Sequence, residues 1–469
     1  MIGKKYTEYF IIILLSFISF EIIFNNLGSS TFFDWDESHY GEVALEILRS
    51  NDWIVLTYGG QPDLIAKPPL GAWLIAISFK IFGVTEFALR FWSALFGVAT
   101  IILVYFFGKE IENDCAGLYS SIILLTSAGF IGFHGARTGD FDVILTFFIT
   151  LSLYFFYLSH KRGDRKFLIG TAVAIALAIL VKGPIGSFPV LIIGIYLIYF
   201  KSLKNDLFNR ETLYAFLSFC ILVLPLFAYR YLKGKEYFES VFEYDVVKRI
   251  VEPVEGHVGD SFFYFNTLFY SYGELFFILI ILVFLYSILL MVKKNKPTSL
   301  FVIWISVIFI FFTIAKTKIF WYIMPIYPAL CLLMGYDIEI LRRSLKIRKK
   351  LFMLIFLFVM ITPFITIVQL TESIYKEPVQ IAIKELKGEL NDLDIIYIHS
   401  EENRQSIYLY LNSYVKDKVI IYNGEINEIN AKKGDGIITF DTGRYRLLLN
   451  SSEYELMKSK KYAAVFRKI

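Results

Sequence analysis

Long apolar runs separated by short polar loops dominate the first 370 residues of this chain. A helix needs about 20 apolar residues to cross the hydrocarbon core of a membrane, with about 17 as the lower limit. Eleven runs reach that length: 9–27, 86–107, 115–133, 142–159, 167–183, 184–200, 213–232, 270–292, 299–315, 319–335 and 351–369. The pattern predicts a polytopic α-helical membrane protein with about eleven to thirteen transmembrane helices.

Two stretches need an interpretation of their own. Residues 167–200 form one long apolar run, and Lys182-Gly183-Pro184 interrupts it, which predicts a tight reversal between two spans. Residues 69–83 are apolar but short, and Pro68-Pro69 precede them. We expect this segment to be a re-entrant or surface helix at the membrane interface.

The hydrophobic pattern changes after residue 370. Apolar runs shorten to strand length at 395–398, 419–422 and 436–440, and an amphipathic helix is expected at 402–412. We therefore expect two domains. Residues 1–370 form the transmembrane domain, which includes an outer-face loop at 28–85, and residues 371–469 form a small extracytoplasmic α/β domain.

Composition agrees with a protein of many spans. The chain is 56% hydrophobic with a mean hydropathy of +0.58, whereas soluble domains are about 45–50% apolar. The net charge of +4 is small and is not gathered into a patch, so nucleic acid is not an expected partner. The three cysteines have no metal-binding spacing. Lys4-Lys5 precede the first run without a small-residue cleavage site, so we expect this run to be retained as a span.

Basic residues in the short loops predict the orientation. With a cytoplasmic N-terminus, the loops 160–166, 293–298 and 336–350 are cytoplasmic, and all three are rich in Lys and Arg. The same arrangement places the polar loops discussed below on the opposite face. We expect a multi-pass protein of the cytoplasmic membrane, with its site and C-terminal domain on the periplasmic or extracellular side.

Three acids, Asp34, Asp36 and Glu37, follow the first span closely. Carboxylates are costly in hydrocarbon, which favours a membrane surface or a wet cavity. They suit a general base that takes a proton from an acceptor hydroxyl or amine. Clustered hard oxygens also suit a divalent metal. The structural alternative is an acidic loop that caps a helix over residues 38–48.

A second acidic loop, residues 134–142, opens the span at 142–159. Asp142 is the first residue of that span and Asp140 lies just outside it. Their simplest role is capping, since a helix N-terminus favours anions. Their functional role would be a second carboxylate that faces Asp36 across a site.

Candidate phosphate-binding residues lie in three other outer-face loops. Lys67 stands before a rigid Pro68-Pro69 turn, where it could hold a phosphate by charge or simply reach the interface. The long loop 233–262 contains Arg249 and His257, and the tip at 316–322 contains two lysines followed by Trp321 and Tyr322. Outer-face lysines oppose the usual charge bias, which favours an anion-binding role.

The chain has no Gly-rich phosphate loop and no dinucleotide-binding fingerprint. An enzyme on the outer face has no supply of nucleotide sugars or ATP. An activated substrate would therefore have to arrive on a lipid carrier.

Taken in order, these motifs resemble a known family. Residues 36–42, Asp-Glu-Ser-His-Tyr-Gly-Glu, resemble the Asp-Glu-x-x-Tyr-x-Glu motif of bacterial GT-C glycosyltransferases of the ArnT and protein-mannosyltransferase superfamily. Residues 67–74 are similar to its Lys-Pro-Pro-Leu box, and residues 136–148 to its second acidic loop. Further similar stretches are 182–184, Arg249 with 256–257, 316–318 and 321–325. The matches keep the family order from residue 34 to about 330.

The resemblance implies an inverting GT-C glycosyltransferase that takes a sugar from a polyprenyl phosphate at the outer face of the cytoplasmic membrane. Asp36 is then the base or the residue that orients the acceptor, and Asp142, with Asp140 as the alternative, is the second acid. The catalytic candidates are Asp36, Glu37, Asp140 and Asp142. The candidates for binding the donor phosphate are Lys67, Arg137, Arg249, Lys318 and Tyr322. Further site candidates are Asp34, Tyr40, His257 and Lys316.

The resemblance leaves the cofactor and the acceptor open. Relatives often have an acid before the Lys-Pro-Pro box, where this chain has Ala66, so no cofactor is certain and a divalent metal is an alternative. The acceptor is a lipid, a glycan or a protein. The alternative function is a transporter or flippase of lipid-linked sugars, but that class favours acids at mid-membrane depth and inverted repeats, and the sequence has neither.

Overall fold

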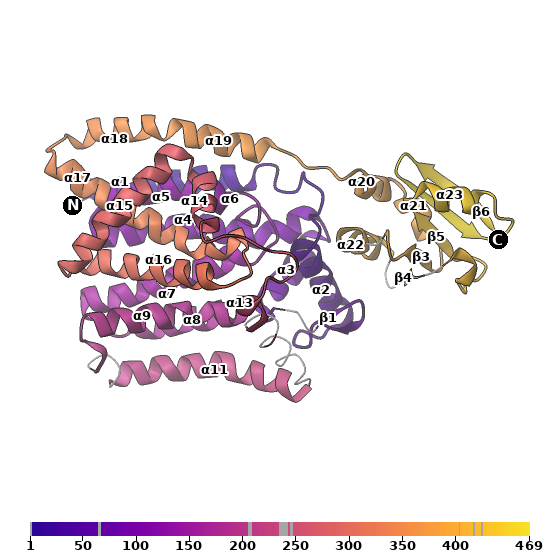
Figure 1. Ribbon diagram of the computed structural model, residues 1–469, viewed down its shortest axis with the longest axis horizontal. Coiled ribbons are helices and arrows are strands. Elements are labelled where there is room, and N and C mark those ends of the chain that lie inside the picture. The colour runs from indigo at the N-terminus through magenta and orange to yellow at the C-terminus, as the bar shows by residue number, and fades with distance from the viewer. Residues whose placement is uncertain are drawn as a thin grey trace.

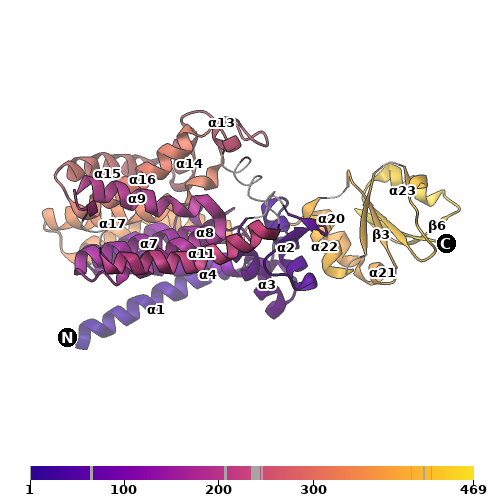
Figure 2. The same ribbon diagram turned by 90° about the horizontal axis from the view of Figure 1, so that it is seen from below.

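The computed structural model describes residues 2–63, 67–204, 209–233, 243, 247–402, 404–415, 418–423 and 425–469. Most of the helices lie side by side as one bundle, with the N-terminus at one end (Figure 1). The small α/β domain projects from the opposite end (Figures 1 and 2). The fold is thus the expected helical membrane protein with a C-terminal α/β domain.

Each of the eleven predicted spans contains helix, but the span predicted at 115–133 is divided into two short helices, Asp114–Leu125 and Ala128–Ile131, which are too short to cross a membrane. The helices of the bundle are α1 (Ile2–Phe24), α4 (Glu86–Ile111), α5 (Asp114–Leu125), α6 (Ala128–Ile131), α7 (Asp142–Arg162), α8 (Phe167–Lys182), α9 (Phe188–Tyr199), α11 (Arg210–Lys233), α14 (Phe263–Tyr272), α15 (Glu274–Val292), α16 (Lys296–Ile314), α17 (Tyr327–Ser344), α18 (Lys349–Val359) and α19 (Ile361–Glu372). The 3-10 helix η3 (Phe320–Ile326) leads into α17, and α18 and α19 form a pair bent by 43°.

By length and apolarity, seven helices among the described residues can cross a membrane, or eight if α18 and α19 form one span. That count treats residues 167–199 as a single helix, but the contacts show a reversal. Lys182 of α8 reaches Asp142 at the start of α7, whereas Tyr196 of α9 packs on Phe156 near the end of α7. The predicted turn between two spans is therefore confirmed.

The turn is the 3-10 segment η1 (Gly183–Ser187), and its residues fit it for local reasons. Gly183 has a φ of +65°, which favours glycine, and Pro184 follows at the first turn. A side chain at Gly186 would collide with the backbone of Ala178 and Ile179, so this glycine lets η1 fold back onto α8.

The end of the bundle near the N-terminus carries the basic loops. Lys109 pairs with Glu8 of α1, Arg162 with Glu110, and Arg343 with Glu112. The opposite end carries α2 (Asp36–Ser50), the short hairpin β1 (Thr57–Tyr58) and β2 (Gln61–Pro62), and α3 (Leu70–Phe82). At 13 residues α3 is short for a span, and it packs against α2 and α4, in line with the predicted surface helix.

The C-terminal domain contains α20 (Pro378–Glu385), α21 (Lys387–Asn391), β3 (Ile396–His399), α22 (Gln405–Tyr414), β4 (Val419–Tyr422), η4 (Ile426–Glu428), β5 (Gly436–Thr439), α23 (Thr442–Leu449), β6 (Tyr454–Lys460) and β7 (Ala463–Lys468). The strand order is β4-β3-β5-β7-β6, with β3, β4 and β5 parallel and the other pairs antiparallel. The three predicted strands correspond to β3, β4 and β5, and the predicted helix corresponds to α22.

Helix α22 joins this domain to the bundle by packing on α2. Leu409 of α22 fills the space beside Gly41, where an added Cβ would lie 2.7 Å from its side chain. Asn412 donates a hydrogen bond of 2.8 Å to the buried carboxylate of Glu42. The helix that begins with Asp36 is therefore held from outside by the C-terminal domain.

Candidate functional site

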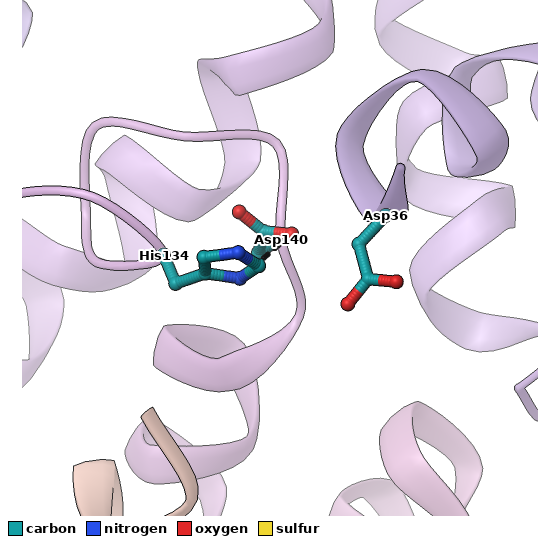
Figure 3. A group of neighbouring side chains, drawn as sticks. All are labelled: Asp36, His134 and Asp140. Carbon is teal, nitrogen blue, oxygen red and sulfur yellow. Dashed lines mark ion pairs between the residues drawn. The ribbon is translucent and has the colours of Figure 1, made fainter. Parts of the chain in front are cut away.

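Two loops bring Asp36, His134 and Asp140 together at the end of the bundle that faces the C-terminal domain (Figures 1 and 3). Asp36 begins α2, and the other two residues lie in the loop between α6 and α7. One ligand atom from each side chain lies within 4.8 Å of the other two. Asp140 and His134 are buried and Asp36 is half-buried, so Asp36 is the most accessible of the three.

Glu37 has a different environment from Asp36, its neighbour. Its carboxylate accepts two hydrogen bonds from the buried guanidinium of Arg90, at 2.5 and 3.2 Å, and one from the backbone N–H of Phe33. The remaining Arg90 donors bind the carbonyls of Leu27, Ser30 and Thr31. Since Glu37 is 2% exposed and fully engaged, we assign it to holding the loop rather than to proton transfer.

The loop before Asp36 is also fixed by the C-terminal domain. Asp34 accepts a hydrogen bond of 3.1 Å from the backbone N–H of Ser406 at the start of α22. Between the two acids, Trp35 has a φ of +68°, which is strained for a bulky residue. Such strain persists only where the surroundings enforce it, and the anchored neighbours Asp34 and Glu37 supply that constraint.

His134 was not among the residues predicted from the sequence. Its ring stacks on Trp321 with centroids 3.4 Å apart and planes 7° apart, and its Nδ1 lies 3.2 Å from Asp140 Oδ1. Burial lowers the pKa of His134, but Asp140, Asp142 and Asp36 outweigh burial and leave that pKa above its ordinary value. Burial raises the pKa of Asp140, and His134, Thr138 and Lys182 outweigh it, so that pKa lies below its ordinary value.

These donors fit a divalent metal ion. His134 Nδ1 and Asp140 Oδ1 are buried and face each other at ion-pair distance, but among the described residues neither atom makes a hydrogen bond of good geometry. Two ligands about 2.1 Å from one ion lie about 3.0–3.5 Å apart, which matches their 3.2 Å separation. Imidazole nitrogen and carboxylate oxygen are both ligands of a divalent ion such as zinc. Ala66, which stands where relatives often have an acid, lies outside the described residues.

Asp142 is engaged by a lysine. Lys182 Nζ lies 2.6 Å from Asp142 Oδ1, and both side chains are buried. The Lys-Gly-Pro motif at 182–184 thus ends a helix beside the first residue of α7. The acid that lies with Asp36 and His134 is therefore Asp140, whereas Asp142 is paired with Lys182.

The Lys-Pro-Pro box lies beside the same turn. Pro68 is the nearest neighbour of the Cβ position of Gly183, at 3.7 Å. Gly71 of α3 packs directly on the ring of Phe141, and Tyr40 of α2 stacks on the same ring with centroids 4.0 Å apart. Tyr40 therefore fixes α2 and the acidic loop to each other, and Lys67 lies half-buried at this junction.

Arg249 and Tyr322, which are 73 residues apart, are brought together. Arg249 Nη1 donates a hydrogen bond of 3.0 Å to the Tyr322 hydroxyl. The two loops also pair through their backbones, since the N–H groups of Lys316, Thr317 and Lys318 donate to carbonyls of residues 250, 249 and 257. The two predicted phosphate-binding residues thus form one unit next to Trp321.

Two other predicted phosphate-binding cations have structural contacts instead. Lys318 Nζ donates to the carbonyls of Phe312, Thr313 and Ala315 at the end of α16, and burial, followed by the charge of Lys316, lowers its pKa. Arg137 donates to carbonyls at the end of α1 and of α19. We therefore leave both residues out of the donor site proposed below.

The remaining candidates lie at the margin. His257 is half-buried and its Nε2 lies 3.8 Å from Glu255. Lys316 is exposed at the tip of its loop. Neither belongs to the cluster around Asp36.

Comparison with known sequences gives a consistent result. Residues 66–229 match the family model described as dolichyl-phosphate-mannose-protein mannosyltransferase. A protein of Aquifex aeolicus is 35% identical over 322 residues, which cover 66% of this chain and 60% of that protein. The undecaprenyl phosphate-alpha-4-amino-4-deoxy-L-arabinose arabinosyl transferase of Wigglesworthia glossinidia brevipalpis is 28% identical, over 67% of this chain and 56% of its own length. This chain thus spans well under two thirds of these two relatives.

The fold has a close counterpart among solved structures. ArnT from Cupriavidus metallidurans, in a crystal structure bound to undecaprenyl phosphate, superposes with a TM-score of 0.75. The alignment covers 97% of this chain and 98% of ArnT, at 15% sequence identity. The similarity therefore includes both the helical bundle and the C-terminal domain.

Proposed function

We propose that this chain, which belongs to the ArnT-like and protein-mannosyltransferase superfamily of GT-C glycosyltransferases, transfers a sugar from a polyprenyl-phosphate carrier to an acceptor. The apolar helices indicate a multi-pass membrane protein. The similarity to ArnT supports a location in the inner membrane. The names of the arabinosyl transferase and of the undecaprenyl-phosphate-bound ArnT support a lipid-phosphate donor.

The observation that carries the proposal is the convergence of Asp36 with His134 and Asp140 at one end of the bundle. Lys67 and the Arg249–Tyr322 unit lie in the loops at that same end. Glycosyl transfer from a lipid phosphate needs a base for the acceptor and cations for the leaving phosphate. The site contains both groups in loops from distant parts of the chain.

Asp36 is the proposed base. Its half-buried carboxylate takes the proton of the acceptor hydroxyl or amine while the acceptor atom forms a bond to C1 of the sugar. The bond from C1 to the phosphate oxygen breaks at the same time, and its electron pair leaves with the lipid phosphate. Attack opposite the leaving group inverts the configuration at C1.

Lys67, Arg249 and Tyr322 are the proposed partners of the leaving phosphate. Negative charge on that phosphate grows in the transition state, so fixed positive charges and hydroxyl donors stabilise the transition state more than the ground state. The planar guanidinium of Arg249 can offer two N–H groups to two phosphate oxygens. The hydrogen bond from Arg249 to the Tyr322 hydroxyl orients the guanidinium before the donor binds.

A divalent ion, when bound, would be held by Asp36, His134 and Asp140 and would supply positive charge to the site. Asp36 would then orient the acceptor. Trp321 fixes the ring of His134 in either case. Glu37 and Arg90 hold the loop in place.

We place the site on the outer face of the membrane. The basic loops around Lys109, Arg162 and Arg343 lie at the opposite end, where the positive-inside bias puts the cytoplasm. The C-terminal domain, residues 371–469, would then be extracytoplasmic and the transmembrane domain would be residues 1–370.

Mass spectrometry of envelope lipids, glycans and proteins from a deletion strain tests the proposal. Complementation with the wild type should restore a sugar on one acceptor, and Asp36→Asn should not. Asp34→Asn is the matched control, because its amide oxygen can still accept from the Ser406 N–H. Equal restoration by the wild type and Asp36→Asn would refute the role of Asp36, and no difference between the deletion strain and the wild type would refute transfer.

A further inference from the structure

A row of aromatic rings runs from the linker before the C-terminal domain to His134. Tyr375 stacks on Phe33 with ring centroids 5.6 Å apart, and Phe33 meets the edge of Phe133 at 5.1 Å. Phe133 meets the ring of His134 at 4.6 Å, and Phe320 lies 6.4 Å from Phe133. We call Phe33, Phe133, Phe320 and Tyr375 the aromatic row.

Much of this row is exposed. Phe133 and Tyr375 are each 48% exposed and Phe320 is 39% exposed. Exposed aromatic side chains also form the ordinary belt at a membrane surface. The aromatic row differs from a belt because its rings contact one another in sequence and lead to His134, which is buried within the acid cluster.

Polar and charged groups lie beside the row at Tyr375 and at Phe33. The Tyr375 hydroxyl donates a hydrogen bond of 2.8 Å to Glu377, which also lies 3.4 Å from Arg404. Asp34 follows Phe33 directly in the chain. A hydrocarbon chain lying here would remove water from these charges without replacing its hydrogen bonds. A sugar ring can place its C–H face on the aromatic rings and its hydroxyls on the carboxylates.

We propose that the aromatic row is the docking surface for the acceptor, and that the acceptor presents a sugar ring whose hydroxyl reaches Asp36. This inference rests on the transferase function proposed above. The sugar hydroxyl gives its proton to Asp36, its oxygen bonds to C1 of the donor sugar, and the phosphate leaves with the electron pair of the broken C1–O bond. The aromatic row therefore determines the acceptor class.

The 3-10 helix η3 keeps this surface separate from the donor phosphate. Its residues point in directions about 120° apart. Phe320 points to Phe133, Trp321 stacks on His134, and Tyr322 accepts a hydrogen bond from Arg249. Acceptor and phosphate would thus approach the cluster from different sides, as inversion at C1 requires.

Sugar binding can be measured without transfer. The full-length protein is placed in lipid nanodiscs, free of glycoside detergents, with methyl glycosides of glucose, galactose, mannose and glucosamine as probes. Saturation-transfer NMR with irradiation of the protein's aromatic protons should label the C–H protons of at least one probe. In the double variant Phe133→Ala/Tyr375→Ala the affinity for that probe should fall about tenfold.

Two further variants serve as controls. Tyr270→Ala removes a ring of α14 that is 81% exposed and outside the row, and it should bind the probe like the wild type. Phe133→Tyr keeps an aromatic face and should also bind. The inference is overturned if no probe is labelled by the wild type, if the double variant binds equally well, or if Tyr270→Ala loses binding to the same extent.

A transfer assay on the same samples separates the two proposals. Wild-type protein that binds a sugar at the row but transfers nothing would contradict the transferase function and not the sugar site. Transfer that persists unchanged in the double variant would contradict the role of the row and leave the transferase function intact. Asp36→Asn should lose transfer and keep sugar binding.

Discussion

The carboxylate of Glu37 accepts a hydrogen bond from the backbone N–H of Gly139, with 3.3 Å between the nitrogen and oxygen. These two residues are the immediate neighbours of Asp36 and Asp140, so one hydrogen bond joins the two loops that carry the acids. Arg90 fixes the other side of the Glu37 carboxylate. The distance between Asp36 and Asp140 is therefore set by groups that lie outside the cluster of Asp36, His134 and Asp140.

Gly139→Ala should disturb the hydrogen bond between Gly139 and Glu37 that joins the two loops. An added Cβ would lie 2.8 Å from Leu89 and 3.1 Å from Glu37, both of which are buried. Overpacking of this kind costs about 1–3 kcal/mol of stability, and a small loop shift can lower transfer about 100-fold. Transfer activity and the thermal midpoint of purified protein measure the two effects. Gly388→Ala, with open space around its Cβ, is the control and should be neutral or slightly stabilising.

Lys182→Met should destabilise the protein strongly. It leaves the Asp142 carboxylate buried without its ion-pair partner at 2.6 Å, and breaking a buried pair typically costs about 3–5 kcal/mol. The double variant Lys182→Met/Asp142→Leu removes both charges and should recover most of the lost thermal stability. A double variant as unstable as Lys182→Met would show that the unpaired charge is not the cause.

His134→Ala and Asp140→Asn should each reduce divalent-metal binding. Both side chains supply ligand atoms to the cluster with Asp36, and losing one ligand of three weakens a site sharply. Metal per protein molecule, measured by inductively coupled plasma mass spectrometry after dialysis against zinc or manganese, gives the readout. His257→Ala should retain the metal because His257 lies outside the cluster. Wild-type protein that retains no ion would contradict the metal site.

Arg249→Ala should weaken binding of undecaprenyl phosphate by about 10- to 100-fold, since a hydrogen bond to a charged group contributes about 1.5–3 kcal/mol. Tyr322→Phe should have a smaller effect, because it removes the hydroxyl that orients the guanidinium at 3.0 Å. Native mass spectrometry of the protein with this lipid measures both. Lys248→Ala, an adjacent cation that pairs with Glu252, is the control. Equal losses for Lys248 and Arg249 would indicate only a general charge effect.

The sequence by itself determined the architecture. A long apolar run favours a helix that can cross a membrane, so each predicted span contains helix and the reversal at Gly183 is present. The run at 115–133 was predicted as one span but forms the short helices α5 and α6. The switch to short apolar runs after residue 370 likewise predicted β3, β4 and β5. The strands β6 and β7 were not predicted, because polar residues such as Glu455 and Lys458 interrupt the apolar pattern in the first of them.

The sequence placed Asp36, Asp140 and Asp142 in outer-face loops and favoured Asp142 as the second acid. Only the tertiary structure showed that Asp140 lies with Asp36 and that Asp142 pairs with Lys182. Glu37 pairs with Arg90, 53 residues away, and Lys182 with Asp142, 40 residues away. Arg137 and Lys318 bind helix ends instead of facing the site. His134 lies in the cluster with Asp36 and Asp140. It was not predicted, because a single histidine in a loop has no motif spacing that would mark it as a ligand. Hydrophobic periodicity is a local property of the sequence and predicts individual helices and strands. The partners of these side chains depend on how the helices pack, which the local pattern does not predict.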